Sequence, residues 1–457
     1  MEEKISLRKY TAISAILLVL IMTVLDVTVV NVAVPVMASK FGITDSNAVW
    51  IVTIYQLVIT MLILPLSSVG DLFSYRRTFL TGVVVFTLAS ALCALSNGFT
   101  MILISRAIQG IGAACVMSVN IALTRLIYPP RILGRGLALN AIVIASATAA
   151  GPTIAGAVLS IASWHWLFLI NLPFGILAFI IGKRHLPANP VKKSGKKYDF
   201  VSAVENMMLF GLIFLGIGGY KGENDELRLA IFLGIAVLIG FFYVRRESRR
   251  AEPMLPVDLF HIKLYTLSIC TSVCSFIAQM LAMVALPFIL LNSYGFSSIL
   301  TGLLMTPWPV ATMIISPIAA RFVEKHNAGV TAAVGMAVFA AGLVLLISLP
   351  ATGVSEWSII WRMTICGTGY GMFQTPNNIM MVTATPIHRT GGAGGMQSTA
   401  RLVGQTLGSA LVTIVFAVGH GDTFNLVHTC LWVSFAFAIA AGLFSVTRKK
   451  AQPRINS

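Results

Sequence analysis

Long apolar segments alternate with short polar segments along the whole chain. Each apolar segment has about 20 residues, the length that a helix needs to cross a hydrocarbon core of about 30 Å. The pattern predicts an all-α integral membrane protein with fourteen spans, at residues 11–35, 47–69, 78–96, 100–123, 137–160, 165–182, 199–220, 228–244, 264–291, 299–320, 328–349, 357–383, 391–418 and 424–446.

The composition and the charge pattern agree with a membrane protein. Hydrophobic residues make up 57% of the 457 residues and charged residues 11%, too few charges to cover a soluble globule of this size. The net charge is +16, but the basic residues gather in alternate loops, on the side of the N-terminus. The positive-inside rule then places both termini in the cytosol and predicts no nucleic-acid partner.

The sequence lacks the signatures of a cleaved leader, a metal site and an enzyme. A short basic start runs into the first apolar segment without a small-residue cleavage site. The six cysteines are scattered through apolar segments without zinc or disulfide spacing. No glycine-rich phosphate loop or nucleophile–base arrangement is evident. We therefore predict an uncleaved first span, no metal, no cofactor and no enzymatic activity.

Two long basic segments that contain prolines divide the spans into six, two and six. This division predicts an N-terminal six-helix bundle at residues 1–182 and a C-terminal six-helix bundle with a short basic tail at residues 264–457. Between them, residues 183–263 hold cytosolic linkers and an inserted helix pair, at 199–220 and 228–244. Duplicated halves with a substrate site between them are the architecture of secondary transporters.

Asp26 lies well inside the first apolar segment. An ionisable side chain at that depth costs about 2.5–3.5 kcal/mol on insertion scales, so it persists where it pairs, faces water or carries protons. Counting helical rise from the membrane surfaces places Arg106 of the fourth span at a similar depth. We predict that Asp26 couples transport to protons and that contact with Arg106 switches it between proton release and proton binding. The alternative is a permanent ion pair that only holds two helices together.

Four segments resemble the motifs of a known family: residues 25–35 (LDVTVVNVAVP), 106–114 (RAIQGIGAA), 151–156 (GPTIAG) and 164–175 (WHWLFLINLPFG). They are similar to motifs of the major facilitator superfamily, and specifically of its fourteen-spanner drug:proton antiporters. The resemblance covers essentially the whole chain.

The resemblance implies two six-helix bundles and two extra helices, rocking about a midplane cavity in the bacterial cytoplasmic (inner) membrane. It implies export of lipophilic, often cationic, drugs or toxic compounds in exchange for protons, with a monomer as the functional unit. The partners would then be these small molecules, protons and the lipid bilayer. Two alternatives stay open: export of a metabolite, siderophore or lipid-like compound on the same fold, and a transport-inactive sensor.

The loop after the second span departs from the family pattern, since the family usually has arginine at the position of Tyr75. Asp71 and the adjacent Arg76 and Arg77 are retained. We expect Asp71, aided by one of these arginines, to dock on the helix N-terminus at residues 391–395 and to latch the cytosolic gate.

The fifth span contains Gly151 and Pro152, followed by Gly156. The proline removes one backbone hydrogen bond, and the small residues let another helix approach closely. We expect this surface to seal the outer half when the cavity opens inward. The alternative is an ordinary membrane proline without a gating role.

Two further ionisable residues lie within spans. Glu205 is a secondary proton candidate, but it lies near the interface in the inserted pair, which favours a structural role. Arg401 shares one helix face with Gln397 and Gln405, one turn on either side. We expect Arg401 to set the conformation or the polarity of the cavity, because an arginine would repel a cationic substrate.

The cavity is expected to be lined by apolar, aromatic and sulfur-containing side chains from facing helices, a mixture that suits lipophilic cations. At helical spacing such residues are also common in helix cores, and that alternative applies to each of them. The candidates are Asn31, Trp50, Tyr55, Gln56, Gln109, Met280, Met283, Trp308, Phe373, Gln374, Asn378, Gln397 and Arg401.

Overall fold

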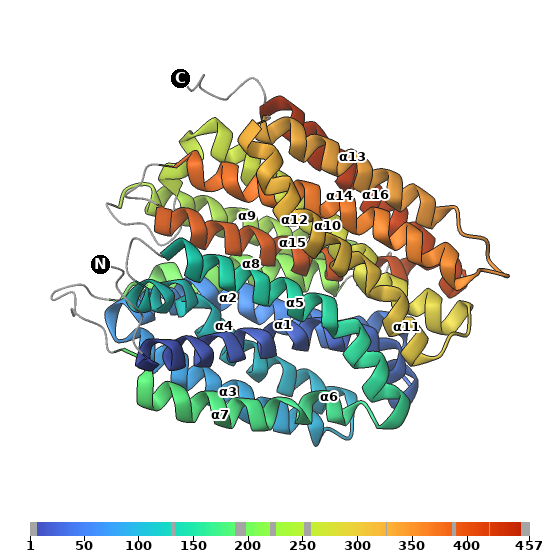
Figure 1. The fold of residues 1–457 in the computed structure, drawn as a ribbon, viewed down its shortest axis with the longest axis horizontal. Helices are drawn as coiled ribbons and strands as arrows, with labels where there is room; N and C mark the ends of the chain where they lie inside the picture. The colour runs from blue at the N-terminus through green and yellow to red at the C-terminus, as the bar shows by residue number, and fades with distance from the viewer. Residues whose placement is uncertain are drawn as a thin grey trace.

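The computed structural model describes residues 7–128, 133–187, 198–219, 225–250, 257–325, 327–385, 390–419 and 421–448, and their regular structure is entirely helical (Figure 1). The first part of the chain forms α1 (Leu7–Phe41), α2 (Asp45–Leu72), α3 (Tyr75–Ala94), α4 (Phe99–Ile127), α5 (Leu133–Ile161), α6 (His165–Leu169) and α7 (Asn171–His185). The middle forms α8 (Phe200–Gly218), α9 (Glu226–Glu247) and the 3-10 turn η3 (Val257–His261). The last part forms α10 (Lys263–Phe288), the π-helical turn η4 (Ile289–Ser293), α11 (Ser298–Met305), α12 (Pro307–Lys325), α13 (Ala328–Ile347), α14 (Glu356–Thr383), α15 (Thr390–Val418) and α16 (Thr423–Thr447).

Within the described residues, thirteen helical segments are long and apolar enough to cross a membrane. One of them combines α6 with α7 and another combines α11 with α12, where the break falls at Pro307, a residue without the N–H that would continue the helix ladder. The fourteenth predicted span is α14, a helix of 28 residues whose sequence includes Gln374, Asn377 and Asn378. The predicted fold class, an all-helical membrane protein with fourteen spans, is confirmed.

The helices pack as two bundles, α1–α7 and α10–α16. α1 begins and α16 ends on the same side of the array, at the left of Figure 1, which we call the terminal side. The bundles meet along two seams: α2 lies against α15, and α5 lies against α11 and α12. The second span of each bundle therefore packs on the fifth span of the other, as expected for duplicated halves.

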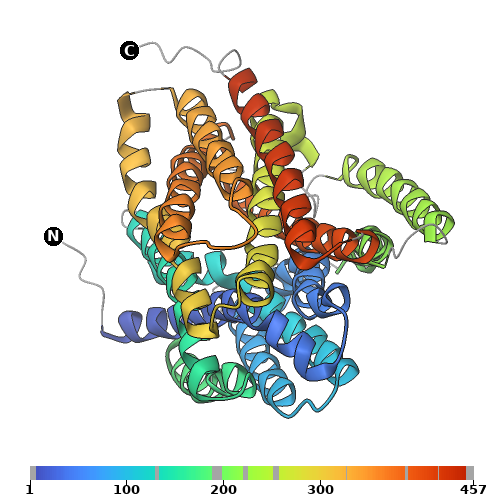
Figure 2. The ribbon, with the colours of Figure 1, turned by 90° about the vertical axis from the view of Figure 1, so that its right-hand side faces the viewer.

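The remaining two spans, α8 and α9, lie beside the bundles (Figure 2). α8 packs on α2 and α15, so it covers the first seam from outside, and α9 packs on α8. This position leaves α9 with little contact to the rest of the chain, and many of its large apolar side chains are exposed on its surface. Such a surface is what a helix facing lipid requires.

The two bundles approach closely on the side opposite the terminal side, at the seam between α5 and α11. A Cβ atom placed on Gly156 would lie 2.7 Å from the carbonyl oxygen of Ser298. A Cβ atom on Gly302 would collide with the carbonyl oxygen of Pro152. Only glycine fits at these two positions, because any side chain would force the bundles apart.

Hydroxyl groups join the bundles at the same level. The hydroxyl oxygens of Thr153 and Thr306 lie 2.6 Å apart across the seam between α5 and α11. Across the other seam, Ser46 donates a hydrogen bond of 3.1 Å to the carbonyl oxygen of Thr413. Both seams are therefore bonded between the bundles on the side opposite the termini.

We expect Gly302→Ala to destabilise this closed arrangement by about 1–3 kcal/mol, because the added methyl group overpacks the seam. Gly234→Ala is the matched control, since a Cβ atom at Gly234 meets nothing within 4 Å. Thermal unfolding in detergent should give a lower Tm for the first variant only. Equal melting of the two variants would show that the seam has room for a side chain.

Candidate functional site

The carboxylate of Asp26 is buried inside the N-terminal bundle, where it forms an ion pair with Arg106. The guanidinium Nη1 of Arg106 donates a hydrogen bond to Asp26 Oδ2. Asp26 is 4% exposed and Arg106 is fully buried, so water does not compete for either charge. α1 and α4 thus meet through a charge-assisted hydrogen bond between the two residues that the sequence pairs.

Two amide side chains complete the surroundings of the carboxylate. Gln109 Nε2 donates to Asp26 Oδ1 (2.8 Å), and Gln109 Oε1 accepts from Arg106 Nη1 (2.6 Å). Asn171 Nδ2 also points to Asp26 Oδ1, at 3.5 Å. Both amides donate to the hydroxyl oxygen of Ser90, at 2.9 and 3.3 Å. One network therefore links α1, α3, α4 and α7.

Arg106 is also held by α2. Its Nε donates to the carbonyl oxygen of Ile51 (3.0 Å), and its guanidinium carbon lies 4.2 Å from the centre of the Tyr55 ring. The close approach of α4 to α2 depends on Gly110, where a Cβ atom would lie 2.9 Å from the carbonyl oxygen of Tyr55. Arg106 Nη2 has no hydrogen-bond partner among the described residues. The guanidinium therefore retains one free donor group in this arrangement of the helices.

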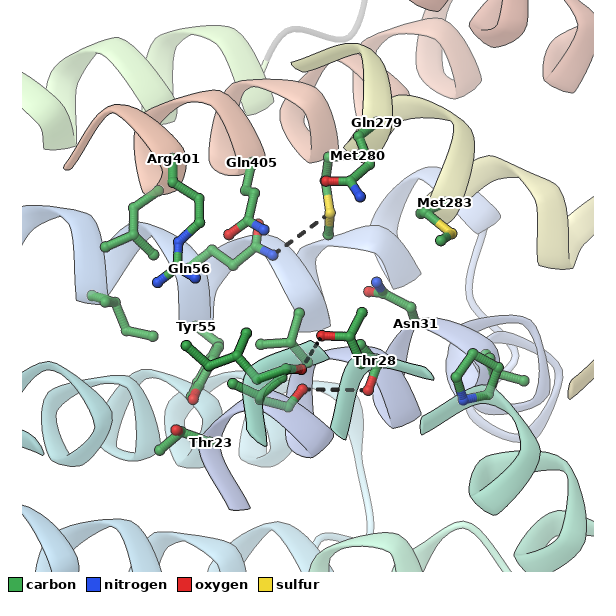
Figure 3. Close-up of a pocket in the computed structure, with 18 of the residues that line it drawn as sticks. Thr23, Thr28, Asn31, Tyr55, Gln56, Gln279, Met280, Met283, Arg401 and Gln405 are labelled. Atoms are coloured by element: carbon green, nitrogen blue, oxygen red, sulfur yellow. Dashed lines mark hydrogen bonds between the residues drawn. The ribbon is translucent and has the colours of Figure 1, made fainter. Parts of the chain in front are cut away.

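A cavity of about 120 Å³ lies between the two bundles (Figure 3). Tyr55 both lines this cavity and stacks on Arg106, so it stands between the cavity and the ion pair. Asp26 and Arg106 do not line the cavity themselves. Its lining consists of Thr23, Val24, Val27, Thr28, Asn31, Val32, Tyr55, Gln56, Ile59, Met117, Ile144, Thr148, Pro152, Gln279, Met280, Met283, Met305, Arg401, Leu402 and Gln405.

The lining includes six of the side chains that the sequence suggested: Asn31, Tyr55, Gln56, Met280, Met283 and Arg401. In Figure 3 the labelled residues of α10 and α15 face those of α1 and α2 across the cavity. Gln56 is fixed in place, because its Oε1 accepts from Ser409 (3.3 Å) and its Nε2 lies 3.9 Å from the sulfur of Met280. The cavity thus combines amide groups and sulfur atoms with an apolar wall.

A family model described as the Major Facilitator Superfamily matches residues 16–409 and 267–457 of the chain. The chain belongs to the major facilitator superfamily. It is 46% identical over 447 residues to the uncharacterized transporter YebQ of Escherichia coli K12, covering 98% of this chain and 97% of YebQ. The family and its transporter relatives indicate a multi-pass membrane transporter of small molecules, not an enzyme.

More distant relatives of this superfamily member differ in their named substrates. The riboflavin transporter RibZ of Clostridioides difficile is 28% identical, with 90% of this chain and 89% of RibZ covered. The multidrug resistance protein Stp of Mycobacterium tuberculosis is also 28% identical, with 87% of this chain and 74% of Stp covered. A crystal structure of a POT family transporter in complex with a thioalcohol-conjugated peptide has the same fold, with a TM-score of 0.71 at 15% identity over 95% of this chain and 96% of that chain.

Several residues suggested from the sequence lie away from the cavity. Trp50 borders a shallow apolar groove between α2 and α4. Trp308 and Phe373 are buried in the C-terminal bundle, where Trp308 packs on Phe339 and Phe373 on Tyr370. Gln109 belongs to the Asp26 network. The other amides are half-buried on α14 and α15 and do not line the cavity: Gln374, Asn378 and Gln397.

Residues that the sequence analysis did not single out also contribute. Asn171 and Ser90 belong to the hydrogen-bond network of Asp26: Asn171 donates to Asp26, and Ser90 accepts from Gln109. The polar and sulfur-containing lining residues that were not among the cavity candidates are Thr23, Thr28, Met117, Thr148, Gln279, Met305 and Gln405; of these, Gln405 had been placed on the helix face of Arg401. Some signals for them were present, since Asn171 lies in the 164–175 motif and Gln405 follows Arg401 by one helical turn.

Glu205 lies in the peripheral pair and holds α8 to α9. Its Oε1 is 3.5 Å from Arg246, which also pairs with Asp199 at 3.0 Å. Burial would raise the pKa of Asp199, but hydrogen bonds from Ser202 and the charges of Arg246 and Arg250 lower it. The charges around Glu205 thus link two helices outside the bundles, consistent with the structural alternative.

The predicted gating residues lie at the terminal side, in the turn between α2 and α3. Tyr75 donates a hydrogen bond of 2.5 Å to the carboxylate of Asp71, so the tyrosine that replaces the family's usual arginine still binds this acid. Arg76 donates to the carbonyl oxygen of Lys183, at the end of α7. Arg77 is exposed. The side chains of residues 391–395 lie outside the described part of the chain, so the latch to α15 stays a prediction.

The predicted small-residue surface of α5 lies at the contact with other helices. Gly151 faces α1, where a Cβ atom would collide with the hydroxyl group of Thr28. Pro152 lines the cavity, and Gly156 packs on α11. α5 is therefore in contact with helices of both bundles at this level.

We expect Gln109→Leu to lower stability by about 1–3 kcal/mol, because Asp26 Oδ1 loses its shortest hydrogen bond inside the bundle. Gln405→Leu is the control, since Gln405 faces the cavity and forms no hydrogen bond with a described residue. Thermal unfolding in detergent measures both variants. A Gln109 variant that melts with the control would show that the network adds nothing to stability.

Proposed function

We propose that this transporter is a proton-coupled antiporter that exports lipophilic small molecules across the bacterial cytoplasmic (inner) membrane. The observation that carries the proposal is the buried pair of Asp26 and Arg106 behind Tyr55, next to a cavity between two bundles. Asp26 is the one acidic residue described in the interior of either bundle, so it is the proton carrier in this account. Protons are the coupling ion, and no other cofactor is proposed.

The pair offers a physical route for coupling. Protonation of Asp26 removes its charge and weakens the bonds from Arg106 and Gln109 that join α1 to α4. The arginine is then left buried without a counter-charge, which favours a helix arrangement that gives it other partners. Because Tyr55 contacts both Arg106 and the cavity, a substrate that displaces Tyr55 acts on the same equilibrium.

The closed side supports a proposal for how access alternates. The bundles are joined on the side opposite the termini through the glycine contacts of α5 and α11 and the hydroxyl contacts of both seams. The charge pattern predicts that both termini lie in the cytosol, so we assign this closed side to the extracytoplasmic face and propose that rocking of the bundles opens it to release substrate. One chain supplies both bundles and the whole cavity, so we propose that a monomer is the functional unit.

A second candidate is the export of a polar metabolite on the same scaffold. Two observations favour it: the relative RibZ is named a riboflavin transporter, and four amide side chains line the cavity, Asn31, Gln56, Gln279 and Gln405. Drug export is favoured by relatives such as Stp, named a multidrug resistance protein. Both candidates share the proton coupling through Asp26.

We expect Asp26→Asn to remain folded and inserted but to lose pH-gradient-driven transport, with the initial rate falling at least about tenfold, because an amide cannot carry the proton. Proteoliposomes and a panel of lipophilic dyes of either charge provide the measurement. Glu226→Gln is the control, since Glu226 is exposed at the start of α9. Full gradient-driven transport by the Asp26 variant would refute the proposal, and a wild-type protein that moves no dye would favour the sensor alternative.

A further inference from the structure

The cavity carries an unbalanced positive charge. Among its lining residues, Arg401 is the one charged side chain, and neither aspartate nor glutamate belongs to the lining. In Figure 3 Arg401 extends from α15 toward Gln56, across the space between the bundles. With the described residues, Arg401 forms no hydrogen bond and no ion pair. Its guanidinium therefore faces the cavity with all of its donors available.

The ion pair of Asp26 and Arg106 does not offset this charge. Asp26 already accepts hydrogen bonds from Arg106 and Gln109, and it lies behind Tyr55. The charges of Asp26 and Arg106 cancel each other, so the pair contributes no net charge to offset Arg401. A cation that enters the cavity would therefore meet Arg401 without a facing carboxylate, and like charges in a poorly hydrated site repel strongly.

An anionic group would instead meet unpaired hydrogen-bond donors in the cavity. The planar guanidinium of Arg401 matches a carboxylate or sulfonate with two parallel hydrogen bonds. Gln405, one turn away on α15, and Gln279, on the neighbouring α10, also line the cavity and bond to no described residue. The rest of the lining, including Met283 and Met305, is apolar or contains sulfur and suits a hydrophobic body.

We propose that the substrates of this transporter are amphiphilic organic anions whose charged group binds Arg401. This inference rests on the proposed function and narrows its substrate class. It replaces the cationic substrates that the family resemblance implies. The shared chemistry is a carboxylate, sulfonate or similar oxyanion attached to an apolar body, whether that body belongs to a drug or to a metabolite.

The charge of the substrate changes the energetics of exchange. Export of one monovalent anion for one entering proton moves two charges inward, so the membrane potential drives it as well as the pH gradient. Exchange of one monovalent cation for one proton moves no net charge and is insensitive to the potential. The response to voltage therefore separates the two substrate classes in the unmodified protein.

The binding test uses three probes with one fluorophore: dansylglycine (anionic), dansylcholine (cationic) and dansylamide (neutral). In nanodiscs, we expect the wild-type protein to bind dansylglycine more tightly than the other two. Arg401→Gln should weaken dansylglycine binding about tenfold or more, and leave dansylcholine binding unchanged or tighter, because one charge-assisted contact is lost. Arg401→Lys should retain most of the preference, and the exposed Arg245→Gln on α9 should behave as wild type.

The transport test needs no variant, so it holds even if Arg401→Gln fails to fold. Liposomes loaded with dansylglycine, at equal pH on both sides, receive a potassium diffusion potential that is negative inside. We expect dansylglycine efflux to accelerate and dansylcholine efflux not to do so. A wild-type preference for dansylcholine, unchanged dansylglycine affinity in a folded Arg401→Gln variant, or efflux that ignores the potential would overturn the inference.

Failure of this inference is distinguishable from failure of the proposed function. If Asp26→Asn abolishes gradient-driven transport while Arg401→Gln leaves charge selectivity intact, proton coupling stands and the substrate class is wrong. If Arg401→Gln removes anion selectivity while Asp26→Asn transports normally, the substrate class stands and the coupling residue is wrong.

Discussion

The buried ion pair between Asp26 and Arg106 is the constraint on which the N-terminal bundle depends. Leaving either charge unpaired in the interior is costly, of order 3–5 kcal/mol when one partner of a buried pair is removed. Four helices supply groups to this pair and to Gln109, and α2 adds the carbonyl oxygen of Ile51 and the ring of Tyr55. A change in the protonation of Asp26 therefore alters hydrogen bonds that join most helices of the bundle.

The second constraint is the close contact between the bundles. Glycines at the α5–α11 seam allow backbone atoms to touch, and such contacts are made or lost as a unit because packed interfaces do not deform continuously. The cavity lies between this seam and the seam of α2 and α15. Tyr55 belongs to α2 and touches Arg106, so the ion pair and the seam share one helix. This shared helix is the physical link between proton binding and access.

The sequence predicted the spans and the pairing of Asp26 with Arg106 because both follow from simple counts. Span length follows from hydrocarbon thickness, and residue depth follows from helical rise. The face that each helix turns to the cavity does not follow from such counts. Trp308 and Phe373 therefore look like cavity residues in the sequence but pack in the C-terminal core, whereas Thr23 and Gln279 line the cavity.

Proton coupling requires that Asp26 change its protonation state as the bundles move. Infrared difference spectroscopy of the purified transporter, comparing the substrate-bound and substrate-free protein, observes this directly through the carboxyl C=O stretch. We expect a protonated carboxyl band in one state that is absent in the other and missing from Asp26→Asn. A carboxylate that stays ionised in both states would contradict it, and would leave the pair as a fixed link between helices.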